Sequence, residues 1–133
     1  MSLKSWAEFG WLKLHKTSGQ EIQNLLAIVD RDLADARQSN LSADWRFGIA
    51  YNAALKLCAI LLFSSGYRPE KSLAHYRTLQ DLPLILGEKW QDEATYLDTC
   101  RIKRNTVEYD CIGGVSNQEA DELIDFVEEL KLR

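Results

Sequence analysis

Apolar residues recur at helical spacing in the first third of the chain. After Ser18 they occur at positions 22, 25, 26, 29, 33 and 36, each one, three or four positions after the last. This spacing places them on one face of an α-helix. Ser18 and Glu21 form the Ser-x-x-Glu pattern of a helix start, in which each side chain bonds a backbone amide of the first turn. We predict a helix from Ser18 to about Gln38. The opposite face, which we expect to be solvated, carries Asp30, Asp32 and Asp35.

A second helix is predicted to begin near Ser42 or Asp44 and to end at Ser65, before Gly66. Glycine is the usual residue just beyond a helix C-terminus. This segment is apolar on almost every side, which is typical of a helix packed by neighbours at the centre of a bundle. The residues that interrupt it recur every four positions and form one strip: Gly48, Asn52 and Lys56. We expect this strip to face solvent, and the alternative is that it faces a groove or a partner.

The rest of the chain predicts three more helices, at about 70–82, 91–109 and 116–130. Pro83 lacks an amide hydrogen and is expected to end or kink the first of them. Ser116 and Glu119 repeat the Ser-x-x-Glu start signal before the last. No segment shows the alternation of a β-strand. Together the patterns predict an all-α fold, an antiparallel helical bundle of four to five helices.

Residues 1–17 precede the first of these helices and are rich in large apolar side chains: Trp6, Phe9, Trp11, Leu12 and Leu14. We interpret them as an aromatic N-terminal arm, and residues 18–133 as a single helical-bundle domain. In the preferred interpretation the arm covers the bundle as a lid. The alternative is a contact between subunits, because aromatic residues are enriched in the cores of interfaces.

Composition narrows the classes of function. The chain has 133 residues, 46% of them hydrophobic, which suits one domain with a buried core. Its net charge of −4 argues against a strongly basic duplex-DNA binder, so a nucleic-acid role requires a local patch. The longest apolar run, at 58–63, is far shorter than the roughly 20 residues of a membrane span. The first ten residues do not resemble a signal peptide. We expect a cytoplasmic protein without membrane contact.

Cysteines and histidines form no metal-binding pattern. The cysteines at 58, 100 and 111 contain no Cys-x-x-Cys pair, and His15 and His75 lie far apart in the sequence. We therefore expect buried thiols in a reducing compartment, and neither a metal nor a cofactor.

Candidate chemistry concentrates in residues 98–110. Three cations, Arg101, Lys103 and Arg104, lie within four residues of one another in an acidic protein. Arg104 falls on or beside the apolar stripe of its helix, where a guanidinium needs an anionic partner. One interpretation is an internal ion pair, formed by Arg101 or Arg104 with Asp98 or with an aspartate of the first helix.

The other interpretation of this stretch is an anion site. Arginine binds phosphate oxygens with its planar fork of N–H donors, and asparagine and tyrosine add oriented hydrogen bonds. Asn105 and Tyr109 are four residues apart and share one strip of the helix. The site would consist of Arg101, Arg104, Asn105 and Tyr109.

The stretch from Arg104 to Tyr109, Arg-Asn-Thr-Val-Glu-Tyr, resembles the signature of the HEPN domains. These are small helical bundles of prokaryotic toxin–antitoxin, abortive-infection and nucleotidyltransferase-associated systems, and they carry arginine, often asparagine, and then histidine a few residues on. The alanine-rich segment 51–57, its end at 66–69 and His75 are also similar to the family. The resemblance spans residues 18–130 and implies a HEPN-like homodimer whose paired arginines face one another across a cleft.

Active HEPN domains cleave RNA without metal, using the ribose 2′-hydroxyl as nucleophile. The resemblance implies that Arg104 stabilises the developing phosphate charge. Tyr109 stands where active members have the histidine that moves protons. Because tyrosine has a pKa near ~10 and histidine near ~6.5, Tyr109 is a poor general base at neutral pH. His75 is the candidate to replace the missing imidazole, and a structural role is the alternative.

Three functions follow. The first is binding of RNA or a nucleotide by a homodimer with weak or no ribonuclease activity, as part of a toxin–antitoxin pair. The second is an active metal-independent ribonuclease toxin, in which Arg104 acts with Tyr109 or His75. The third is a non-catalytic interaction or dimerisation module for a nucleotidyltransferase-type partner protein.

Overall fold

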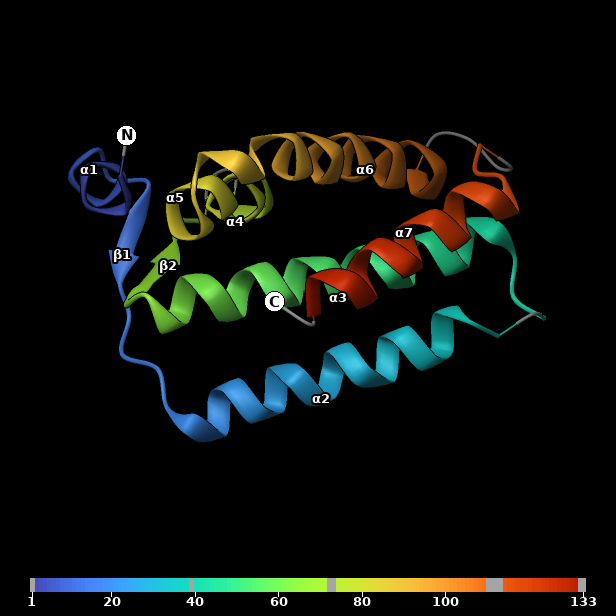
Figure 1. Ribbon diagram of the computed structural model, residues 1–133, viewed down its shortest axis with the longest axis horizontal. Coiled ribbons are helices and arrows are strands. Elements are labelled where there is room, and N and C mark those ends of the chain that lie inside the picture. Colours follow the sequence, from blue (N-terminus) through green and yellow to red (C-terminus); the bar gives the residue numbers. More distant parts are fainter. Residues whose placement is uncertain (1, 39, 72–73, 110–113, 132–133) are drawn as a thin grey trace.

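Figure 1 shows the chain as a computed structural model, which describes residues 2–38, 40–71, 74–109 and 114–131, with the backbone alone at 106–109. Most of the described residues are helical. The long helices among them are α2 (Gly19–Ala36), α3 (Ala43–Ser64), α6 (Gln91–Tyr109) and α7 (Asn117–Lys131). Successive long helices run in opposite directions in Figure 1, so the all-α, antiparallel prediction is confirmed.

The helices begin and end where the capping residues predict. Ser116 accepts a hydrogen bond from the Glu119 amide at 3.1 Å, and Glu119 accepts one from the Ser116 amide, also at 3.1 Å. At the start of α2, Ser18 accepts from the amide of Glu21, whereas the Glu21 carboxylate bonds neighbouring side chains instead. Gly66 follows α3 with φ of +94°, a conformation that glycine adopts without strain.

The stretch from the helix expected at about 70–82 to the next long helix consists of short pieces. These pieces are α4 (Ala74–Gln80), α5 (Leu82–Leu86) and the 3₁₀-helix η1 (Glu88–Trp90). Pro83 lies in the first turn of α5, where its missing amide hydrogen costs no helical bond. The prediction that Pro83 ends or kinks this helix is confirmed.

The expectation of no strands is wrong at two short segments. β1 (Leu12–Leu14) pairs antiparallel with β2 (Tyr67–Pro69), and Lys13 lies opposite Arg68. Three residues are too few for an alternating pattern to stand out in a sequence. The strands form because the N-terminal segment runs alongside the chain where it leaves α3 (Figure 1).

The N-terminal segment packs onto the bundle. It begins with α1 (Leu3–Glu8), and Trp6 and Leu12 are buried in a cluster with Leu62 of α3. The guanidinium of Arg77 in α4 lies 3.7 Å from the centre of the Trp11 ring, a cation–π contact that adds to the packing. Of the two alternatives for the arm, the structure therefore places it over the bundle.

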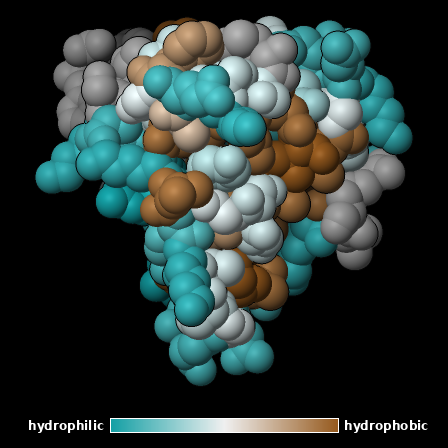
Figure 2. All heavy atoms as spheres, turned by 90° about the vertical axis from the view of Figure 1, so that its left-hand side faces the viewer, coloured by the Kyte–Doolittle hydropathy of each residue, from teal (hydrophilic) through white to brown (hydrophobic). Residues whose placement is uncertain are grey.

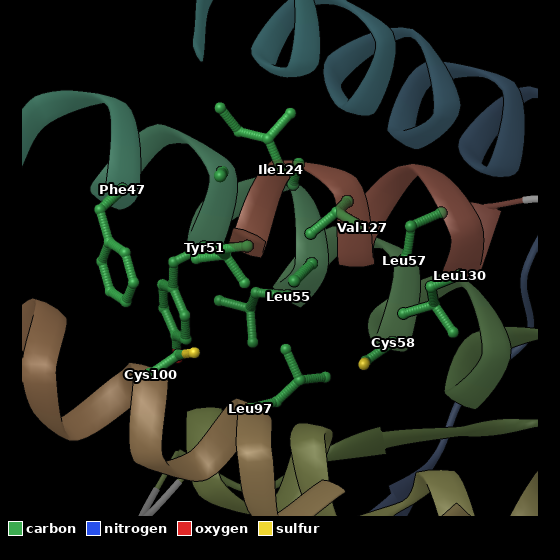
Figure 3. Close-up of a cluster of buried hydrophobic side chains, with 14 of the residues drawn as sticks. Phe47, Tyr51, Leu55, Leu57, Cys58, Leu97, Cys100, Ile124, Val127 and Leu130 are labelled. Carbon is green, nitrogen blue, oxygen red and sulfur yellow. The ribbon is translucent and has the colours of Figure 1, made fainter. Parts of the chain in front are cut away.

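α3 is the central helix of the bundle and contacts α2, α6 and α7. Figure 3 shows Phe47 and Tyr51 reaching from α3 toward α6, where Cys100 lies. Ile124 and Val127 of α7 belong to the same buried cluster. α3 is also the one described helix long and apolar enough to cross a membrane by length and composition. Its contacts with three other helices account for that composition within the bundle.

An apolar hollow of about 140 Å³ opens between α2, α3, α5 and α7. Figure 2 views the end of the molecule that carries β1 and β2, and apolar residues gather on one side of it. The hollow is lined by Leu26, Leu57, Ile60, Leu61, Leu86, Leu130 and Lys131. Lys131 is the one polar lining residue and is bonded to Asp30, so this hollow offers little to orient a ligand.

Candidate anion-binding site

Tyr51 is the centre of the candidate site. Its side chain is 1% exposed and comes from the middle of α3. The guanidinium of Arg104 lies 5.7 Å from the centre of the Tyr51 ring, and the His75 ring centre lies 6.3 Å from it. The Tyr51 hydroxyl is 3.5 Å from Nδ1 of His75. Residues from α3, α4 and α6 therefore meet at one buried ring.

Two further cations complete this group. Lys56 of α3 and Arg101 of α6, together with Arg104, interact electrostatically with His75. The guanidinium of Arg101 also lies 5.7 Å from the centre of the Tyr76 ring. We call the group the Tyr51 cation cluster and define it as Tyr51, Lys56, His75, Arg101 and Arg104.

The register of α6 explains why its arginines lie here. Leu97 and Cys100 are buried against α3, so Arg101 and Arg104 flank the buried stripe and stay half-buried. Arg101 Nε donates to Oδ1 of Asp98 at 2.8 Å, which is one of the ion pairs that the sequence allowed.

Arg104 is held by its sequence neighbour. Its Nη1 donates to Oδ1 of Asn105 at 3.1 Å, so Asn105 positions the guanidinium. In this arrangement the asparagine of the Arg-Asn pair orients the arginine, and an incoming anion would meet a guanidinium that is already fixed in direction.

Electrostatics favour an anion at this cluster. It contains the permanent cations Lys56, Arg101 and Arg104, and the carboxylate of Asp98 pairs with Arg101, in a chain whose net charge is −4. Partial burial, followed by the charges of Arg104, Lys56 and Arg101, lowers the pKa of His75 below its usual value. The three cations share one neighbourhood and repel one another, and a bound phosphate would relieve that repulsion.

The proton chemistry of the cluster rests on His75. Burial raises the pKa of Tyr51, with the nearby arginines opposing it, so Tyr51 stays protonated at neutral pH and is no general base. His75 has a lowered pKa and is exposed at the surface, so its neutral form can accept a proton. Among the described residues of the cluster, His75 is thus the one suited to proton transfer near pH 7.

A hollow of about 210 Å³ adjoins the cluster at Arg104. We call it the Trp45 hollow; its lining residues are Asp32, Trp45, Gly48, Ile49, Asn52 and Arg104. The strip that we expected to face solvent therefore contributes Gly48 and Asn52 to a groove. Solvent was the wrong expectation for these two residues because α2 and α6 both border this side of α3.

Asp32 corrects another expectation. We placed it on a solvated face, but it is 5% exposed. Its Oδ2 accepts from Nδ2 of Asn52 at 2.6 Å, and its Oδ1 accepts from Arg31 at 2.9 Å. Burial is tolerated because both oxygens are hydrogen-bonded. A signal for this burial was present in the spacing, because Asp32 follows Val29 by three residues and precedes Ala36 by four, which places it at the edge of the buried stripe of α2.

The structure brings most of the sequence-derived candidates together. His75, Arg101, Arg104 and Asn105 lie in or beside the Tyr51 cation cluster. Tyr109 is the last residue of α6, and its side chain lies outside the described residues. Sequence reasoning missed Tyr51 and Trp45, which carry no pattern that separates them from ordinary core or surface aromatic residues.

The cysteines among the described residues offer no exposed thiolate. Cys58 and Cys100 are buried thiols, and burial raises the pKa of both, to about 11 for Cys100. Cys111 lies outside the described residues. Within the described ranges no group of three or more His, Cys, Asp or Glu side chains could hold a metal ion.

Comparison of the chain with family models, with curated proteins and with solved structures finds no match.

Proposed function

We propose that this chain binds the phosphates of RNA or of a nucleotide at the Tyr51 cation cluster, with weak or no ribonuclease activity. The observation that supports this proposal is the gathering of Lys56, His75, Arg101 and Arg104 from three helices around one buried tyrosine. Guanidinium groups fixed in direction suit phosphate oxygens, which they bind through paired hydrogen bonds.

The wider setting of the proposal comes from the HEPN resemblance. In this proposal the protein is a cytoplasmic homodimer that acts within a toxin–antitoxin pair, and the arginine-bearing faces of its two copies are turned toward each other. Ile102 of α6 is 54% exposed and lies close to Asp98 and Asn105 on the helix surface. An exposed isoleucine on the helix that carries the arginines is suited to be covered by a second copy, and the mass in solution tests this.

Binding of a fluorescent single-stranded RNA, followed by anisotropy, tests the phosphate site. Arg104→Ala should lower the affinity at least tenfold while the melting temperature stays close to that of the wild type. Lys89→Ala removes one positive charge at an exposed position of η1 and serves as the control, with affinity unchanged. Contacts of three cations with phosphate predict a slope of about −2 in a plot of log affinity against log salt concentration.

The outcomes separate the interpretations of Arg104. If it is only a buried ion-pair residue, its replacement should lower the free energy of unfolding by about 3–5 kcal/mol. A wild-type protein that is folded but binds neither RNA nor nucleotide contradicts the proposal and favours the interaction module, which copurification with a nucleotidyltransferase-type partner would then test.

A second candidate function, metal-independent RNA cleavage, is favoured by His75. It is the described cluster residue able to accept a proton at neutral pH, and it lies near Arg104. Incubation with mixed cellular RNA in EDTA should then produce fragments with the wild type and none with Arg104→Ala or His75→Ala. Intact RNA with the wild type removes this candidate for the isolated protein.

A further inference from the structure

The Trp45 hollow has a composition that the cation cluster does not explain. Trp45, Gly48, Ile49 and Asn52 are spaced by three and four residues and therefore lie on one face of α3. Arg104 of α6 borders the same hollow and belongs to the cation cluster as well. A ligand held by the cluster would thus extend directly into this hollow.

Trp45 presents a large aromatic surface to solvent. Its side chain is 57% exposed although tryptophan is mostly buried in folded proteins. It lies in the first turn of α3, held by the bond from its amide to Ser42. An exposed aromatic face beside a guanidinium is the combination that binds single-stranded nucleic acid, in which bases stack on rings and phosphates meet cations.

Gly48 leaves open space next to that ring. It lies inside a 22-residue helix, where glycine is less favourable than alanine. No atom lies within 4 Å of the position that a Cβ would occupy, so packing does not require glycine here. The missing side chain deepens the hollow at the point where a flat ring beside Trp45 would lie.

The size of the hollow limits what it can hold. At about 210 Å³ it is smaller than the roughly 300–1,000 Å³ of pockets that enclose whole small molecules. It therefore suits one part of a longer ligand. The carboxylate of Asp32 at its inner side disfavours a second phosphate and can accept hydrogen bonds from the amino group of a base.

We propose that the Trp45 hollow takes one nucleobase of single-stranded RNA, stacked on Trp45 above Gly48, while the adjacent phosphate is bound by Arg104. This inference rests on the proposed function, because it needs the phosphate site at the cation cluster. It adds the substrate class: an unpaired strand is bound and a duplex is not, since paired bases cannot leave the stack to reach Trp45.

The test measures the affinity of the full chain for three probes: an oligoadenylate, the same strand in a duplex with oligouridylate, and inorganic tripolyphosphate. Trp45→Ala removes the ring, Trp45→Phe keeps a smaller one, and Gly48→Leu fills the hollow. Phe9→Ala is the matched control, because Phe9 is also 57% exposed but lies in the N-terminal segment.

The single strand should bind more tightly than the duplex and quench the fluorescence of the exposed Trp45. Trp45→Ala should weaken oligoadenylate binding about 5- to 150-fold, the loss that corresponds to one base–aromatic stack of about 1–3 kcal/mol. Trp45→Phe should recover part of that loss. Gly48→Leu should weaken binding without lowering the melting temperature, and tripolyphosphate binding should stay unchanged in all three variants.

Failure of this inference is distinct from failure of the proposed function. If the wild type binds neither oligoadenylate nor tripolyphosphate, the phosphate site and the base site are both overturned. If it binds both, and Trp45→Ala and Gly48→Leu bind oligoadenylate as the wild type does, the phosphate site stands and the base site is overturned. Conversion of a dimer to monomers by Trp45→Ala assigns the ring to a subunit contact and also overturns the inference.

Discussion

At the scale of single residues, Asp81 is a carboxylic acid in an apolar setting. It lies between α4 and α5 and is fully buried, and within the described chain neither carboxylate oxygen has a hydrogen-bond partner. Its backbone carbonyl accepts hydrogen bonds from the amides of Leu84 and Ile85 in α5, while the side chain caps nothing. Burial raises the pKa of Asp81 well above its usual value, because the charged form cannot be solvated there.

This gives the stability of the protein a pH dependence with a defined sign. Below the usual aspartate pKa, the folded and unfolded chains both hold the proton. As the pH rises above it, the unfolded chain releases the proton while folded Asp81 keeps it. The free energy of unfolding then falls by up to about 1.4 kcal/mol per pH unit until the raised pKa is reached.

Asp81→Asn should therefore be more stable relative to the wild type at pH 7 than at pH 4. Urea denaturation of both proteins at the two pH values measures the difference between their free energies of unfolding. The contributions of all other titrating groups cancel in that difference. Gln118→Ala, at an exposed position of α7, removes no titrating group and is the control, whose difference from the wild type should not depend on pH. A pH-independent difference for Asp81→Asn would show that folding leaves the pKa of Asp81 unchanged, and a difference of the opposite sign would show that the folded protein stabilises the ionised carboxylate.

Tyr109 and His75 show which partners of Arg104 the sequence alone can indicate. The family resemblance implied that Tyr109 acts with Arg104, and the type of residue indicated weak proton chemistry. The imidazole of His75 joins the cluster from α4, 29 residues before Arg104 in the chain. Spacing within one helix cannot reveal such a partner, because the contact depends on how α4 packs against α3 and α6.

At the scale of elements, one residue at the start of α7 takes part both in the helix cap and in a contact with another helix. Glu119 accepts the amide of Ser116 and also forms an ion pair with Lys103 of α6. The Ser-x-x-Glu pattern indicated the first interaction. The ion pair depends on the placement of α7 beside α6, which no local pattern encodes.

Ser116→Ala should lower the free energy of unfolding by about 1 kcal/mol, because the Glu119 amide loses its acceptor. Ser64→Ala, at the exposed C-terminal end of α3, is the matched control and should change stability by less than about 0.5 kcal/mol. Chemical denaturation measures both. Equal effects of the two substitutions would mean that the cap bond adds nothing to the stability of α7.

At the scale of the whole molecule, the N-terminal segment behaves as part of the core. Leu12 and Leu14 belong to the same strand, but Leu12 is 3% exposed and Leu14 is 80% exposed. Leu12 packs with Trp6 and Leu62 over the end of α3. The arm and the bundle therefore bury apolar surface against each other, and the hydrogen bonds between β1 and β2 add to this attachment.

Leu12→Ala should lower the free energy of unfolding by about 2–5 kcal/mol, the cost of removing a large buried side chain. Leu14→Ala, the same substitution two residues away, should change it by less than about 0.5 kcal/mol. Thermal or urea unfolding of the full chain measures both. A small effect of Leu12→Ala would show that the arm detaches from the bundle in solution.

The sequence by itself determined where the long helices lie and which faces they bury. Caps such as Ser18, Ser42 and Ser116 act on amides within one turn, and apolar stripes need only the 3.6-residue period of the helix. These interactions join residues close together in the chain, so their patterns can be read directly. The antiparallel bundle then follows from short connections between helices that are apolar on one or more faces.

Only the tertiary structure decided which polar residues meet. Asp32 is buried because Asn52 of α3 lies opposite it, and the strip on α3 borders a groove because α2 and α6 enclose it. β1 and β2 pair across more than fifty residues of chain. Such contacts depend on the packing of whole helices against one another, and packing joins residues that no local spacing relates.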